Sequence, residues 1–235
     1  MIKMKIWGLL ASLLITLISC NSKKAKQNIP LRQLDIASKQ FVADSNIFYL
    51  PMDSLYMLGS YKEADTFIKR KLSNILLAAK EPVLQNIKLE QTSFRFLWAR
   101  PFDPAVIVRI NIQEGMCFAN VKVVEKDYKE LGVYSFQLVM DTIVLLKNKF
   151  CTDFYNSFKK TNFLNVQTKD TNAVEVEDET VWLVEGMDKT RYHFIYRPYK
   201  DKNQFNGFEF VKYLYDIGKS LVEMRNRKEL PRDEQ

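Results

Sequence analysis

Histidine occurs only once in these 235 residues, at His193, and the chain has only three cysteines, seven glycines and seven prolines. A Ser-His-Asp or Cys-His catalytic centre would have to use His193, and the Gly-x-Ser-x-Gly turn of one large hydrolase class is absent. The glycines never cluster, which excludes the common phosphate-binding loops. One histidine and widely spaced cysteines exclude the usual zinc patterns. We therefore expect no cofactor and no metal site, and the sequence identifies no catalytic residue.

The composition is that of an ordinary globular protein, with 47% hydrophobic and 27% charged residues. The net charge is +7 and the isoelectric point is about 9.1. Basic clusters such as Lys69-Arg70-Lys71 and Lys159-Lys160 are small and interleaved with acidic residues, so nucleic acid is not an expected partner.

The N-terminus has the pattern of an export signal. Lys3 and Lys5 precede a mostly apolar run from Ile6 to Ile18, and small Ser19 follows. This order is typical of a secretory signal peptide. The run is short for a transmembrane helix, which needs about 20 apolar residues, but an uncleaved anchor helix remains the alternative.

Leu17-Ile18-Ser19-Cys20 resembles the lipobox of bacterial lipoproteins. This resemblance covers residues 1–20 and implies cleavage before Cys20, which would then carry acyl chains on its sulfur and its new amine. Residues 1–19 would be the signal peptide, and residues 20–33 a basic tether that is solvated or lies on anionic headgroups. No acidic residue follows Cys20 directly, which favours a periplasm-facing protein in the cell envelope.

The rest of the chain, residues 34–225, is expected to form one α+β domain followed by a charged tail, 226–235. Apolar residues recur at helical spacing in three segments and at a spacing of two in the others. We expect a mostly antiparallel sheet of about six strands, made of a four-strand meander and a hairpin, with the helices packed on one face. The expected helices cover about 61–80, 147–160 and 208–224; the meander runs from Leu89 to Leu145, and the hairpin over 181–197.

With Cys20 acylated, Cys117 and Cys151 remain as a pair. A disulfide between them is chemically permitted outside the cytoplasm. The alternative is two plain buried thiols, because both residues fall on apolar sides of expected elements.

The expected hairpin contains the only convergent polar set. If Glu185 pairs with Arg191, then Leu183 faces His193, and side chains alternate along each strand. One face would then carry the candidate ligand-binding residues Glu185, Arg191, His193 and Arg197. Such a face can bind an acidic ligand through the two guanidinium groups. It can equally be the solvated outer face of an edge hairpin, without any function.

The hairpin also resembles a pattern in uncharacterised secreted and lipoprotein families, namely Trp-x-x-Glu, then Tyr-His, then Arg-x-Pro or a close variant. The matching residues are Trp182, Glu185, Tyr192, His193, Arg197 and Pro198, and the segment from Phe94 to Arg109 resembles the strands before them. This resemblance implies no known activity.

Two functional hypotheses follow. The first is a lipid-anchored envelope protein, held in the membrane by acylated Cys20, whose domain is a non-enzymatic module that binds an envelope protein or glycan. The alternative is a small-ligand-binding or hydrolytic protein that uses the polar face of the hairpin.

Overall fold

The computed structural model describes residues 49–50, 62–86, 92–113, 116–130, 133–168, 180–187, 191–198 and 207–227, all of which belong to the compact unit Ala37–Gln235. The expected signal peptide, Cys20 with its tether, and residues 228–235 of the expected tail lie outside these ranges. None of the helices in the described ranges is long and apolar enough to cross a membrane.

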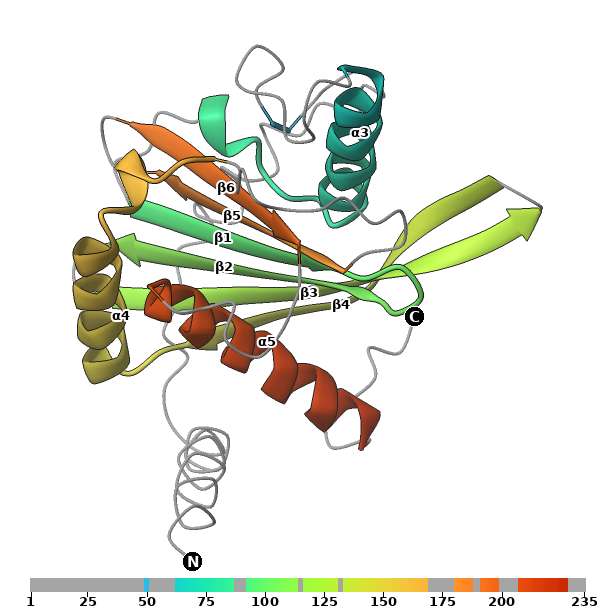
Figure 1. The fold of residues 1–235 in the computed structure, drawn as a ribbon. Helices are drawn as coiled ribbons and strands as arrows, with labels where there is room; N and C mark the ends of the chain where they lie inside the picture. The colour runs from blue at the N-terminus through green and yellow to red at the C-terminus, as the bar shows by residue number, and fades with distance from the viewer. Residues whose placement is uncertain are drawn as a thin grey trace, which may run out of the picture. The chain divides into compact units, whose positions relative to one another are not determined.

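An antiparallel sheet of six strands forms the centre of the described structure (Figure 1). The strand order is β4-β3-β2-β1-β5-β6, so β1 to β4 form a meander and the β5–β6 hairpin pairs with the other side of β1. This confirms the α+β class and the expected meander with a hairpin. The strands are β1 Thr92–Ala99, β2 Ala105–Gln113, β3 Met116–Glu130, β4 Val133–Leu145, β5 Val181–Met187 and β6 Tyr192–Pro198.

Three α-helices occupy nearly the ranges expected from the spacing of apolar residues. They are α3 Lys62–Ala78, α4 Asn148–Thr161 and α5 Glu209–Asn226. Two short 3-10 helices, η1 Leu84–Asn86 and η2 Phe163–Asn165, lie in the connections.

The helices cover both faces of the sheet, which corrects the expectation that they share one face. Helices α4 and α5 pack on the face that carries Phe94, Phe96 and Val106. Helix α3 packs on the opposite face, against Leu97 and Ile107, and Figure 1 shows it on the other side of the sheet. The physical reason is that the central strands are apolar on both sides, so each face needs a cover.

The larger core lies between the sheet and helices α4 and α5. Aromatic rings fill its centre, and the Phe94 ring lies 5.1 Å from that of Phe154 and 4.4 Å from that of Phe158. Helix α5 approaches β2 closely at Gly218, where an added β-carbon would lie 2.9 Å from a Val106 methyl carbon. Only a glycine permits this contact without displacement of the helix or the strand.

Strands β3 and β4 extend beyond the rest of the sheet as a two-stranded arm (Figure 1). The last β2 partner of β3 is Ala105, which lies opposite Val124. Beyond that point β3 and β4 pair only with each other, and register shifts occur near Val123 and Tyr128.

Candidate functional site

The hairpin pairs in a different register from the one expected. Glu185 lies opposite Phe194 instead of Arg191, and His193 lies opposite Gly186 instead of Leu183. The displacement is an odd number of residues, which exchanges the two faces of β6 relative to β5. Arg191 precedes β6 and is exposed.

The four candidate residues are therefore not brought together on one face. Glu185 lies on the α3 side of the sheet, where its neighbours Leu183 and Phe194 belong to the core beneath α3. His193 and Arg197 lie on the side of α4 and α5, together with Ile195. The polar face on which the alternative hypothesis depended is not assembled.

Glu185 is fully buried and holds two partners on the α3 side. The Arg95 guanidinium donates from Nε to Oε2 at 2.6 Å and from Nη2 to Oε1 at 2.7 Å. The Tyr192 hydroxyl donates to Oε1 at 2.9 Å. Two parallel hydrogen bonds to a planar guanidinium give the strongest geometry available to a carboxylate.

A second carboxylate, Glu81, reaches the same side of the sheet from the end of α3. The helix ends in a Schellman motif, in which the Glu81 N–H bonds to the Leu76 carbonyl and the Lys80 N–H to the Leu77 carbonyl. Lys80 has φ of 51°, in the left-handed region. This turn redirects the chain so that Glu81 is buried against the strands, with only 1% of its surface exposed.

Three cations surround Glu81. Arg109 Nε lies 2.8 Å from Oε2, and Lys122 Nζ lies 3.0 Å from Oε1. Arg95 Nη1, which donates to the Pro82 carbonyl at 2.6 Å, lies 3.6 Å from Oε2. We call these side chains the buried ion network; its members are Glu81, Arg95, Arg109, Lys122 and Glu185.

The network is buried, and its three cations face two carboxylates within it, while Lys122 also lies 3.7 Å from exposed Asp141. Burial acts to raise the pKa of Glu81, but the charges of Arg109, Lys122 and Arg95 outweigh it and lower the pKa to about 2. Burial raises the pKa of Glu185, against the opposing effect of Arg95. Because the closest contacts of the network join the end of α3 to strands β1, β2, β3 and β5, we assign the network to holding α3 on the sheet.

His193 and Arg197 have structural contacts on the other face. The His193 ring meets the Phe163 ring edge-on at 5.2 Å, and burial lowers the pKa of His193. Arg197 donates to the carbonyls of Thr168 at 2.7 Å and Gln167 at 2.8 Å. Both side chains thus hold the segment that follows α4 against β6.

The two cysteines lie in the core between β3 and α4. Both are buried free thiols, and burial together with the neighbouring Cys151 thiol raises the pKa of Cys117. The described residues contain no group of three or more His, Cys, Asp or Glu side chains placed to hold a metal ion.

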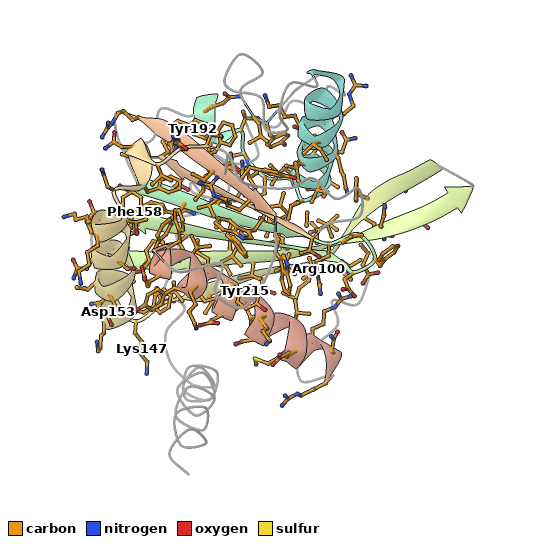
Figure 2. The ribbon with its side chains drawn as sticks, viewed as in Figure 1. Arg100, Lys147, Asp153, Phe158, Tyr192 and Tyr215 are labelled. Carbon is orange, nitrogen blue, oxygen red and sulfur yellow. The ribbon has the colours of Figure 1, made fainter. Side chains whose placement is uncertain are left out.

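A shallow hollow of about 490 Å³ lies between the β1–β2 connection, β3 and the end of α5. Arg100 lines it, stacks 4.3 Å from the Trp98 ring and lies beside α5 (Figure 2). Arg100 pairs with Asp103 at 3.3 Å, and Arg225 pairs with Glu125 at 3.4 Å. The hollow therefore presents no excess of either charge.

A group of exposed apolar side chains lies on the α3 side of β3 and β4, at the end of the sheet where β4 finishes. Met116 is 47% exposed, Ile143 49% and Leu145 56%. Leu145 lies directly opposite partly exposed Phe118. Alternation along the strands places all of them on one face. We call this the apolar patch; its members are Met116, Phe118, Ile143 and Leu145.

The apolar patch borders an open strand edge. In the described part of the chain, β4 is the last strand on its side of the sheet, so one row of its backbone N–H and C=O groups has no strand partner. Exposed Lys147 follows two residues after Leu145 and points away from the fold (Figure 2). Sequence reasoning did not find this surface, because Ile143, Val144 and Leu145 are all apolar, so their pattern does not show which face of β4 is covered.

The chain matches no protein-family model. A search of curated proteins also gave no match.

Proposed function

We propose that this chain is a lipid-anchored protein of the bacterial cell envelope, held by acylated Cys20 and facing the periplasm. Its α+β domain is a binding module that docks an extended segment of another envelope protein along strand β4. The observation that carries this proposal is the exposed apolar patch beside the open edge of β4.

The apolar patch and the open edge of β4 would bind different parts of the same extended segment. An added strand would bond to the free backbone groups of β4, and its alternate side chains would cover Ile143 and Leu145. Monomeric proteins rarely expose clustered apolar side chains unless these bind a partner. A free strand edge specifically favours a polypeptide, because a lipid surface or a glycan does not offer a continuous row of matching backbone groups.

Charge indicates what flanks the docked segment. Lys147 and Lys149 are exposed and closely follow Leu145 in the chain, and Lys149 pairs with Asp153 of its own helix at 2.7 Å. An acidic residue beyond the apolar part of the segment would therefore lie near Lys147. Such a contact at the rim would speed association more than it would add affinity.

The hydrolytic alternative loses its geometric support. It needs Glu185 beside His193, and the hairpin register separates these side chains onto opposite faces. Glu185 is also fully buried against Arg95, out of reach of a substrate.

The proposal is tested by removing the apolar surface without weakening the strand. Threonine favours strands as isoleucine does, so a protein with Ile143→Thr and Leu145→Thr should fold normally. The full-length chain is purified from membranes in mild detergent, and the stoichiometry of co-purifying protein is measured.

We expect a stoichiometric partner with the wild type and at least a tenfold loss of it with the double variant. Phe102→Ser is the matched control, because Phe102 is 84% exposed but lies in the β1–β2 connection. Equal loss in both variants, or none in either, would refute docking at β4.

A further inference from the structure

Hydrogen bonds link both Cys117 and Cys151 to the connection between β4 and α4. The Leu146 N–H bonds to the Cys117 carbonyl at 2.9 Å, which fixes the start of the β4–α4 connection against β3. Cys151 lies one turn into α4, where its thiol donates to the Lys147 carbonyl at 3.3 Å. Cys117 and Cys151 belong to the same buried cluster between the sheet and helices α4 and α5, where burial together with the neighbouring Cys151 thiol raises the pKa of Cys117.

We propose that Cys117 and Cys151 form a disulfide in the mature protein, which covalently joins β3 to α4. The inference rests on the proposed extracytoplasmic location, since disulfides persist in oxidising compartments. The oxidant is a protein disulfide of the oxidoreductase class. One cysteine thiolate attacks that disulfide, the other displaces the oxidant's sulfur, and the oxidant leaves with two thiols that carry both electrons and both protons.

Both sulfurs are buried, which determines when the exchange takes place. Cys117 is 0% exposed and Cys151 7%. An oxidoreductase cannot reach them in the folded domain, so the bond forms before α4 has closed on the sheet. The finished bond is then shielded from reductants by the same core residues.

The cross-link encloses the whole β3–β4 hairpin and the first turn of α4. The cross-link lies at the end of β3 that carries the apolar patch, because Cys117 is adjacent in sequence to Met116 and Phe118. Patch residues Met116 and Phe118 point to the opposite face of β3 from Cys117, which lies in the core under α4. A disulfide there would hold the docking surface in place without reaching it.

Thiol counting on the full-length protein tests the proposal. The protein is extracted from membranes, denatured in acid without reductant, and treated with a polyethylene glycol maleimide that adds a visible mass to each free thiol. A second sample is reduced before the same treatment. Acylated Cys20 does not react, so we expect no additions before reduction and two after it.

The other outcomes separate the two proposals. Two additions in both samples mean that Cys117 and Cys151 are free thiols, which overturns the disulfide and leaves the anchor intact. A total of three additions after reduction means that Cys20 is not acylated, which overturns the anchor. A disulfide-linked dimer on a non-reducing gel also overturns the intramolecular bond.

Thermal unfolding gives an independent measurement. Reduction in denaturant followed by refolding with the reductant present should lower the melting temperature of the wild type by about 5–10 °C, as loss of a typical disulfide does in chains of this size. A variant with Cys117→Ala and Cys151→Ala should not respond to the reductant. An equal response in both proteins would contradict the proposal.

Discussion

At Glu81, burial and neighbouring charge act on one carboxyl group in opposite directions. Burial disfavours the charged form, whereas Arg109, Lys122 and Arg95 favour it, and the three cations prevail with a pKa of about 2. The unfolded chain has the ordinary value of 4.5. Because the folded-state pKa is the lower one, the carboxylate contributes stability that is complete above the unfolded value and is lost as pH falls toward 2.

Glu81→Gln should lower the free energy of unfolding at neutral pH by about 3–5 kcal/mol, since it leaves buried cations without their partner. The difference from the wild type should narrow as the pH falls from about 4.5 toward 2, because over this range the carboxyl group of the unfolded wild type takes up a proton while that of the folded protein is still charged. Urea unfolding at neutral pH and near pH 3 measures both effects.

Asp216→Asn is the control, because its pair with Lys212 is largely exposed and should contribute little at any pH. A Glu81→Gln difference that stayed constant down to pH 3 would contradict the assigned titration.

Individual residues also show where sequence reasoning failed. Arg95 and Arg109 stand within largely apolar strands, yet both are buried and paired with glutamates from other elements. No local pattern indicates such a pairing, because Glu81 and Glu185 are distant in sequence. The apolar patch was missed for a similar reason, since burial depends on what covers a strand.

Among the elements, the spacing of apolar residues predicted well which helices and strands form. It predicted less well which of these elements pair or pack with one another. The periods of 3.6 and 2 gave the helices and the meander, because each element must present an apolar side to the core. The hairpin register depended on the turn, and a three-residue displacement of Glu185 from Arg191 to Phe194 changed every face assignment in β6. For the same reason, the sequence did not show that helices cover both faces of the sheet.

The packing of α5 on β2 depends on one glycine. A β-carbon at Gly218 would lie 2.9 Å from Val106 and 3.0 Å from Val108, and both neighbours are stiff, buried side chains. We expect Gly218→Ala to lower the free energy of unfolding by about 1–3 kcal/mol, despite the better helix propensity of alanine.

Ser220→Ala, two residues later in the same helix and only partly buried, is the matched control. It should be neutral or slightly stabilising in the same urea titration. If Gly218→Ala stabilised the protein as much as Ser220→Ala does, the close approach of α5 would be wrong.

For the molecule as a whole, the proposed anchor and the proposed docking surface have different origins. The anchor comes from residues 1–20, which lie outside the described residues, and the docking surface comes from the fold. Several acyl chains hold a protein firmly, since each buried methylene contributes about 0.8 kcal/mol.

Cys20→Ser should therefore move the protein from the membrane fraction to the soluble fraction, or leave it with an uncleaved signal. Fractionation after a high-salt wash measures this, with Cys151→Ser as the control that keeps the anchor. A Cys20→Ser protein that still partitions fully with membranes and has lost residues 1–19 would contradict acylation.

Site-specific photo-crosslinking along β4 tests the central claim most directly. A crosslinking residue is placed in turn at positions 141 to 145 of the full-length protein in intact cells. An added strand makes contact with a period of two, so positions 143 and 145 should capture one partner while 142 and 144, which face α4 and α5, should not. Equal capture at all five positions, or capture only at a control site such as Phe102, would contradict docking at β4.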